Sequence, residues 1–94
     1  MIGVSERDEQ VFEVLNELGL HARPVTRIVQ TASRFRCEVE LERDGQKANA
    51  KSVMGMLLLA CHKGSRVTVR ASGDGAAQAV AAIGELFAGR FGER

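Results

Sequence analysis

The chain has 94 residues, of which 45% are hydrophobic, and its formal net charge at pH 7 is +1. This length suits one small domain with a packed core, and the near-zero charge argues against a nucleic-acid-binding protein. No apolar run reaches the roughly 18 residues that a membrane span needs. The polar start of the chain also lacks the layout of a signal peptide. We therefore expect a cytoplasmic protein without membrane insertion.

The first half of the chain predicts a strand, a helix and a second strand. Residues 1–9 are polar and are expected to form a flexible lead-in. Branched and aromatic side chains over 11–15 predict the first strand. Apolar residues at helical spacing predict a helix over 22–35. Apolar and charged residues alternate over 37–42, which indicates a strand with one buried face.

The second half predicts two more strands and two more helices. An Asp-Gly dipeptide favours a tight turn before a weakly patterned strand over 46–50. Ser52 is a suitable N-cap for a short helix over 53–60. Alternation returns over 66–71 and predicts the fourth strand, and apolar spacing over 76–87 predicts the last helix.

The order of these elements is β-α-β-β-α-β-α. Helices on one face of an antiparallel sheet can bury their apolar sides and leave the polar face of the strands in solvent. We therefore predict an α+β fold, an open-faced β-sandwich in which three helices cover one face of a four-stranded antiparallel sheet. The sequence shows no internal repeat or linker, so residues 10–94 are expected to form a single domain.

His21 is the strongest candidate for chemistry, because it stands between Gly19 and the pair Arg23-Pro24 at the start of the first predicted helix. The free N–H groups and positive dipole end of a helix favour a phosphate or carboxylate there. A neutral imidazole is also a nucleophile at physiological pH. A histidine in this place is more often a polar loop residue or a cap, and the surrounding combination is what favours catalysis. The sequence offers no acid or base in a motif with His21, so it does not indicate a free-standing hydrolase.

Two segments of the chain resemble one known family. Residues 19–24, with the sequence GLHARP, are similar to the active-site motif of HPr, the histidine-containing phosphocarrier of bacterial phosphotransferase systems. Residues 51–56, with the sequence KSVMGM, resemble the regulatory-serine segment of the same family. The resemblance extends from about residue 10 to the C-terminus and implies the open-faced sandwich described above. Two separate motifs in one small domain make this match specific.

The resemblance also implies roles for particular residues and partners. His21 would accept a phosphoryl group on Nδ1 from enzyme I and pass it to enzyme IIA-type proteins. The backbone at Ala22 and the guanidinium of Arg23 would bind the phosphoryl oxygens. Ser52 would be the site of regulatory phosphorylation by a serine kinase/phosphorylase. The carrier itself would need no cofactor or metal and would be a monomer. The expected partner interface comprises Leu20, Arg27, Lys51, Val53, Met54 and Leu57.

The sequence leaves several alternatives open. Residues 86–91 resemble the nitrogen-related branch of these carriers, whereas residues 51–56 resemble carriers regulated by a serine kinase. A regulatory binding module of the same fold, with little role in sugar transport, is the main alternative function. A small ligand-binding α/β domain without phosphoryl chemistry is a weaker one. Arg27 could equally be a solvated surface residue, and for Leu20 an anchoring role in the core is favoured over contact with a partner.

The remaining cysteine and histidine residues indicate no site of their own. Cys37 and Cys61 are expected to be buried free thiols rather than a disulfide pair. Cys61 and His62 are adjacent, but a tetrahedral metal site needs three or four ligands and the chain has few candidates. The sequence assigns no role to these three residues.

Overall fold

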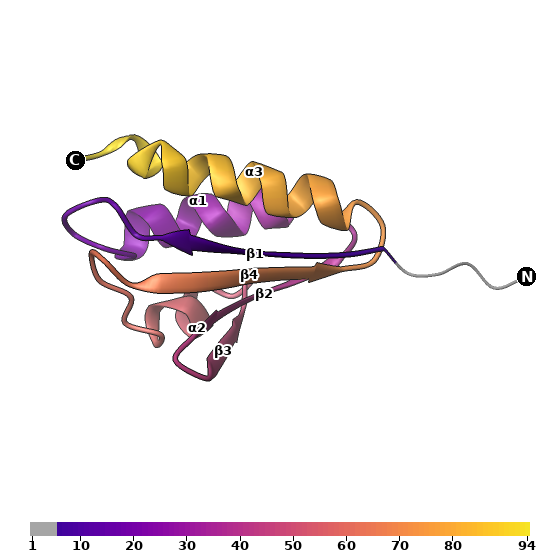
Figure 1. Ribbon diagram of the computed structural model, residues 1–94, viewed down its shortest axis with the longest axis horizontal. Coiled ribbons are helices and arrows are strands. Elements are labelled where there is room, and N and C mark those ends of the chain that lie inside the picture. Colours follow the sequence, from indigo (N-terminus) through magenta and orange to yellow (C-terminus); the bar gives the residue numbers. More distant parts are fainter. Residues whose placement is uncertain (1–5) are drawn as a thin grey trace, which may run out of the picture.

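The computed structural model describes residues 6–94, which form the predicted order of four strands and three helices (Figure 1). Positions 1–5 of the predicted lead-in lie outside the described residues. None of the helices in the described part of the chain is long and apolar enough to cross a bilayer. The elements are β1 (Arg7–Glu13), α1 (Ala22–Ala32), β2 (Glu38–Arg43), β3 (Gln46–Asn49), α2 (Val53–Leu57), β4 (Arg66–Ser72), α3 (Ala76–Ala88) and a 3-10 turn, η1 (Arg90–Gly92).

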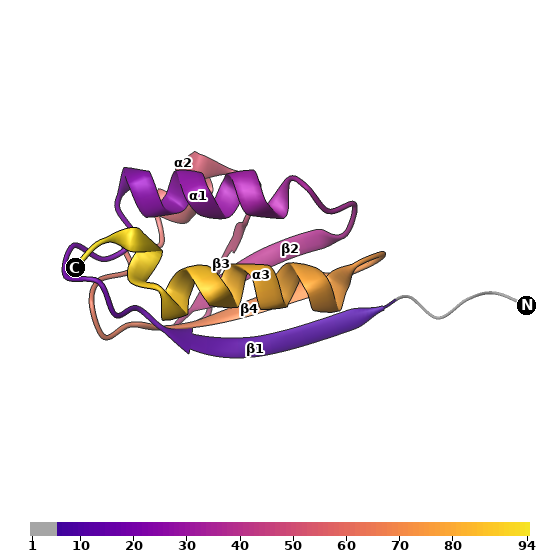
Figure 2. The same ribbon diagram turned by 90° about the horizontal axis from the view of Figure 1, so that it is seen from above.

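The four strands form one antiparallel sheet in the order β1-β4-β2-β3. Helix α3 packs along β1 and β4, helix α1 lies beside α3, and the short α2 lies beside α1 (Figures 1 and 2). The predicted fold class, an open-faced sandwich with helices against one face of the sheet, is confirmed.

Along β2 and β4, buried and more exposed side chains alternate, so they lie on opposite faces of the sheet. Leu41 and Val69 pair across the two strands, and both are fully buried beneath the helices. On the opposite face, Arg70 binds three carboxylates, with its Nη1 2.6 Å from Glu40 Oε2. The other two carboxylates belong to Glu9, 2.6 Å from Arg70 Nε, and Glu42, 2.8 Å from Nη1. These ion pairs join β1, β4 and β2 on the open face.

The boundaries of some elements differ from the predicted ones. Strand β1 begins at Arg7, which pairs with Ser72 of β4, so residues 7–9 belong to the sheet and not to a lead-in. Only one face of β1 contacts the core, and residues 7–9 are all charged. They therefore lack the apolar pattern that predicts a strand. Helix α1 ends at Ala32 and α2 ends at Leu57, each three residues earlier than predicted. Beyond the two helix ends, Leu59 is buried and Phe35 is partly buried in the turns, whereas Leu58 is exposed.

Candidate functional site

His21 is the N-cap residue of α1 and has extended backbone geometry. Its carbonyl oxygen accepts the first hydrogen bond of the helix, from Val25 N at 3.1 Å. The N–H groups of Ala22 and Arg23 open the helix and have no carbonyl four residues earlier within it. The imidazole makes no capping bond and its side chain is 35% exposed. The ring is therefore accessible at a helix end that favours anions.

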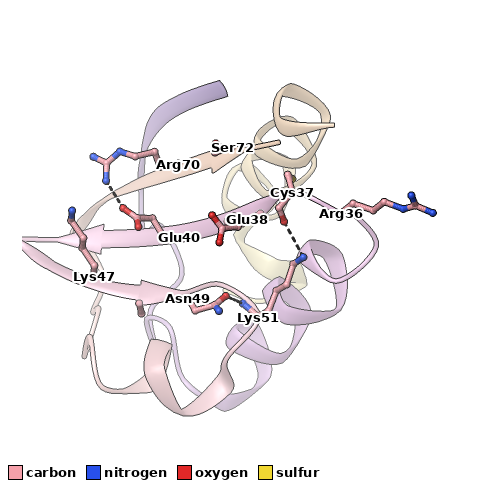
Figure 3. A pocket seen from close by; sticks show the side chains of 11 residues that line it. Arg36, Cys37, Glu38, Glu40, Lys47, Asn49, Lys51, Arg70 and Ser72 are labelled. Atoms are coloured by element: carbon pink, nitrogen blue, oxygen red, sulfur yellow. Dashed lines mark hydrogen bonds and ion pairs between the residues drawn. The ribbon is translucent and has the colours of Figure 1, made fainter. Parts of the chain in front are cut away.

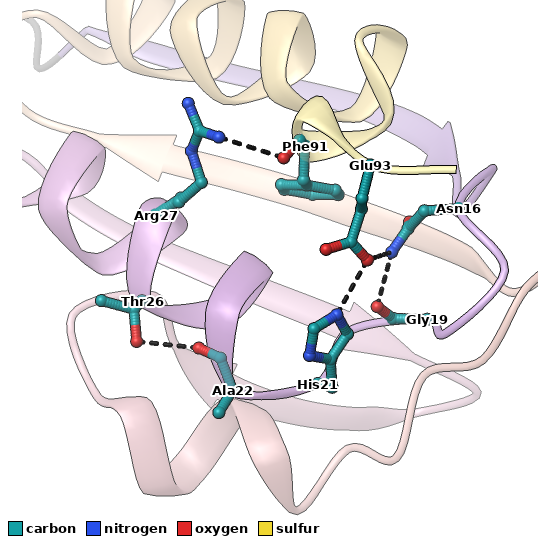
Figure 4. Close-up of polar contacts among 8 residues, drawn as sticks. All are labelled: Asn16, Gly19, His21, Ala22, Thr26, Arg27, Phe91 and Glu93. Carbon is teal, nitrogen blue, oxygen red and sulfur yellow. Dashed lines mark hydrogen bonds and ion pairs between the residues drawn. The ribbon is translucent and has the colours of Figure 1, made fainter.

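A carboxylate near the C-terminus forms a hydrogen bond with one nitrogen of this ring. His21 Nε2 lies 2.8 Å from Glu93 Oε1 (Figure 4). The same oxygen accepts a hydrogen bond from Asn16 Nδ2 at 2.8 Å, and Asn16 Nδ2 also donates to Gly19 O at 2.7 Å. Asn16 itself is fully buried. Neither Asn16 nor Glu93 was among the residues that the sequence predicted for the site.

The environment of Glu93 favours its ionised form. The hydrogen bond from His21 lowers the pKa of this carboxyl against the opposing effect of burial, with further lowering from Asn16 and from the charge of Arg23. Glu93 is therefore a carboxylate at neutral pH and acts as an acceptor toward Nε2. The other ring nitrogen of His21, Nδ1, is therefore the one without a hydrogen-bond partner in the described part of the chain.

The turn after α3 brings Glu93 to His21. Three consecutive residues have left-handed backbone, with φ of 56° at Arg90, 55° at Phe91 and 74° at Gly92. This geometry is costly for residues with a Cβ, and the burial of Phe91 compensates for it. The Phe91 ring is 1% exposed and packs edge-on against Phe87 at a centroid distance of 5.0 Å. Arg27 Nη1 also donates to Phe91 O at 3.0 Å, which fastens the turn to α1 (Figure 4).

The loop before His21 is packed tightly against the segment that follows α2. Gly19 has φ of 67°, and a Cβ built there would lie 2.5 Å from Cys61 O. Leu20 N donates to the same carbonyl at 2.9 Å. Leu20 is 4% exposed and belongs to the hydrophobic core, so the prediction that it contacts partners is wrong. A buried side chain anchors the loop but offers no surface to a partner.

Arg23 lies on the exposed side of the first turn of α1. Within residues 6–94 its guanidinium makes no hydrogen bond or ion pair. Its charge nevertheless reaches Glu93 and contributes to the lowered pKa of that carboxyl. Arg23 is therefore close to the imidazole and its donors are uncommitted.

Ser52 is the N-cap of α2, as predicted, and its Oγ accepts a hydrogen bond from Gly55 N at 3.1 Å. A Cβ at Gly55 would lie 3.1 Å from that Oγ, so the glycine leaves room for the cap. Among the apolar residues of this segment, Met54 is 68% exposed and Val53 is 38% exposed. Leu57 is half-buried against the core, whereas Leu58, which the sequence did not single out, is 75% exposed.

The ammonium group of Lys51 is committed to the backbone. Its Nζ donates to Phe35 O and to Cys37 O, each at 2.9 Å. Lys51 also lines a hollow of about 410 Å³ on the open side of β2 and β3, next to charged residues of both signs (Figure 3). None of the residues around His21 lines this hollow. Lys51 therefore ties the loop after α1 to α2, and it could meet a partner only by leaving these carbonyls.

Cys37 and Cys61 are buried free thiols, as predicted. Burial raises the pKa of the Cys61 thiol above its ordinary value, so it stays protonated beneath the Gly19 loop. His62 is exposed, and its Nδ1 lies 3.2 Å from Lys63 O. These contacts indicate packing and loop structure for the three residues.

The chain is similar in sequence and in structure to known HPr proteins. A family profile described as the PTS HPr component phosphorylation site matches residues 8–89. Phosphocarrier protein HPr of Xylella fastidiosa is 44% identical over 85 residues, which cover 90% of this chain and 96% of that protein. The crystal structure of HPr-C-His from Thermoanaerobacter tengcongensis is 41% identical, with a TM-score of 0.89, and covers 93% of this chain and 98% of its own. A crystal structure of an HPr dimer from the same organism is 43% identical, with a TM-score of 0.74, and covers 86% of this chain and 93% of its own.

Proposed function

The chain belongs to the HPr family of phosphocarrier proteins of the phosphotransferase system, and from this premise we propose that His21 Nδ1 carries the phosphoryl group. The donor would be phosphorylated enzyme I and the acceptors would be enzyme IIA-type proteins. A phosphocarrier is not a stand-alone enzyme, because its larger partners complete each transfer. The protein would act in the cytoplasm as a monomer.

One observation carries this proposal. The imidazole is hydrogen-bonded to Glu93 through Nε2, whereas Nδ1 has no hydrogen-bond partner in the described residues and lies at the N-terminus of α1. The Nδ1 lone pair would form the new bond to phosphorus while the bond between phosphorus and the donor breaks. The phosphoryl oxygens would be received by the N–H groups of Ala22 and Arg23 and by the Arg23 guanidinium. A phosphoryl group on imidazole nitrogen is easily passed on, whereas a serine ester would hold it.

The test is transfer in a defined mixture of this protein, purified bacterial enzyme I and phosphoenolpyruvate. We expect the intact mass to increase by one phosphoryl group, and we expect that group to be stable in alkali and labile in acid. Omission of enzyme I is the control and should prevent the increase. A chain that gains no phosphate from phosphorylated enzyme I would not act as the proposed carrier.

Arg23→Lys is expected to slow this transfer by roughly tenfold, although it keeps the positive charge, because an ammonium group lacks the planar fork that binds two phosphoryl oxygens. The matched control is Arg34→Lys, an exposed position in the turn that follows α1. Rapid-quench phosphorylation by enzyme I would measure both rates. Equal rates for the Arg23 variant and the parent would mean that Arg23 is only a surface residue.

The surface proposed for partners combines the Arg23 guanidinium with the apolar side chains of α2. Val53, Met54 and the adjacent Leu58 are exposed, and methionine suits contact with more than one partner. Because α1 packs against α2, a surface that includes this cationic residue and the apolar patch would favour enzymes with an acidic rim around an apolar centre. Arg27, in contrast, is engaged by Phe91 O, so we assign it to holding the C-terminal turn.

We also propose that Ser52 is a site of regulatory phosphorylation by a serine kinase/phosphorylase. Ser52 is half-exposed at the start of α2, where a phosphate is compatible with the helix end. About two negative charges would be added next to Val53 and Met54. Such charges would repel a partner with an acidic rim.

Ser52 variants should separate stability from docking. Ser52→Ala removes the acceptor for Gly55 N and is expected to lower the free energy of unfolding by about 0.5–2 kcal/mol. Ser52→Asp keeps a capping oxygen and should retain the parent's stability while accepting phosphate more slowly from enzyme I. Urea unfolding and phosphorylation rates at low salt measure the two effects. A Ser52→Asp variant phosphorylated as fast as the parent would remove the case for regulation.

A further inference from the structure

The hydrogen bonds around His21 have a fixed polarity. Gly19 O can only accept, so Asn16 must present its Nδ2 group to that oxygen, 2.7 Å away. The same Nδ2 group donates to Glu93 Oε1, and that oxygen also faces His21 Nε2. A flipped Asn16 amide would place its oxygen against two acceptors. The Asn16 amide therefore donates to both Gly19 O and Glu93, and the Glu93 carboxylate accepts from the His21 ring.

Asn16 is held in this orientation at some cost. The residue is fully buried, and its Oδ1 has no hydrogen-bond partner within residues 6–94. Buried amides normally satisfy both ends, so the fold leaves an acceptor unpaired in order to keep Nδ2 between Gly19 O and Glu93.

From this geometry we infer that Asn16 and Glu93 are positioning residues, which keep the neutral His21 ring protonated on Nε2 and leave the lone pair on Nδ1. The inference rests on the proposed function and deepens it. The Arg90–Gly92 turn delivers Glu93 to this position, and Arg27 fastens that turn through Phe91 O. The site is thus assembled from the two ends of the domain.

The carboxylate also has a role during the transfer step. The Nδ1 lone pair forms the bond to phosphorus, and the electron pair of the broken bond leaves with the donor. Because Nε2 keeps its proton, the phosphorylated ring gains positive charge, which faces Glu93 Oε1. When the group moves to an acceptor, the electron pair of the N–P bond returns to Nδ1 and the ring becomes neutral. Glu93 therefore stabilises the charge that each transfer creates.

The first test is the ring nitrogen spectrum of the unphosphorylated protein, labelled with ¹⁵N in histidine and recorded at a pH where the ring is neutral. We expect His21 Nε2 to have the shift of a protonated nitrogen and Nδ1 that of an unprotonated one. Glu93→Ala should increase the fraction of the Nδ1-protonated tautomer. Glu93→Gln should preserve the parent's pattern, because its amide oxygen can still accept from Asn16 and His21. Unchanged shifts in the Glu93→Ala variant would overturn the inference.

The second test is the rate of phosphorylation by enzyme I and phosphoenolpyruvate. Glu93→Gln retains the acceptor without the charge and is expected to be roughly tenfold slower than the parent, and Glu93→Ala should be slower still. The matched control is Glu85→Gln, an exposed position on α3, which should leave the rate unchanged. Rates within about twofold of the parent for both Glu93 variants would overturn the role in transfer.

These two tests also separate the inference from the function on which it rests. The nitrogen shifts are measured without enzyme I, so a tautomer change in Glu93→Ala supports the positioning role even if the parent accepts no phosphate. Phosphorylation of the parent together with unchanged Glu93 variants would retain the phosphocarrier function and reject the positioning role.

Discussion

His21→Ala is expected to abolish phosphorylation by enzyme I, with a loss of at least about a thousandfold in rate. The substitution removes the only imidazole at the N-terminus of α1, and no other described side chain nearby has an uncommitted nucleophilic nitrogen. The fold should survive, because the ring is partly exposed and its polar bond is the one to Glu93. We expect the loss of that bond to lower the free energy of unfolding by about 1 kcal/mol.

His62→Ala is the matched control for this variant. His62 is exposed in the turn before β4, and its ring contacts Lys63 O and Arg43. It should accept no phosphate, so its removal should leave the rate of labelling unchanged. Undiminished labelling of the His21→Ala protein, or loss of labelling in the His62→Ala protein, would show that His21 is not the acceptor.

Gly19→Ala is expected to cost about 2–5 kcal/mol of folding stability and to displace the loop that carries His21. The added Cβ would lie 2.5 Å from Cys61 O and 2.7 Å from His62 Cα, and both are backbone atoms that cannot turn aside. Relief of that overlap would separate the two loops and break the Leu20 N to Cys61 O bond. His21 would move with its loop, so phosphorylation should slow as well. Urea unfolding and the enzyme I assay measure the two effects.

Gly45→Ala provides a control for backbone conformation alone. Gly45 has φ of 83°, but a Cβ there would meet no atom within 4 Å. Its cost should therefore be limited to the left-handed conformation, about 1–2 kcal/mol, with no effect on phosphorylation. Equal costs at the two glycines would show that contact between the Gly19 loop and Cys61 does not constrain the site.

The fold could be predicted from the sequence because its main signals are local. Alternation in β2 and β4 placed Leu41 and Val69 on the buried face, and helical spacing placed Ile28 of α1 there too. Strand β1 was predicted to begin four residues too late and to end two residues too late, because its charged residues lie on an edge strand whose pairing with β4 depends on a segment about 60 residues away. Pairing with a distant strand leaves no signal in the sequence of β1 itself.

The same limit explains which part of the site was missed. His21, Arg23 and the Ser52 cap are marked by neighbouring residues in the sequence. Glu93 reaches His21 across 72 positions, through a left-handed turn at Arg90 and Phe91 that no residue type predicts. Leu20 was included in the partner interface through the family resemblance, and the structure instead supports the alternative that it anchors its loop in the core.

The position of the phosphoryl group is the most direct test of the account. The protein, labelled with ¹⁵N in histidine, would be phosphorylated by enzyme I and phosphoenolpyruvate and kept at alkaline pH. Nitrogen and phosphorus spectra would then show which ring nitrogen is coupled to phosphorus. We predict coupling to Nδ1 of His21, with Nε2 still protonated and facing Glu93. Coupling to Nε2, or phosphorus bound to another residue, would contradict the account.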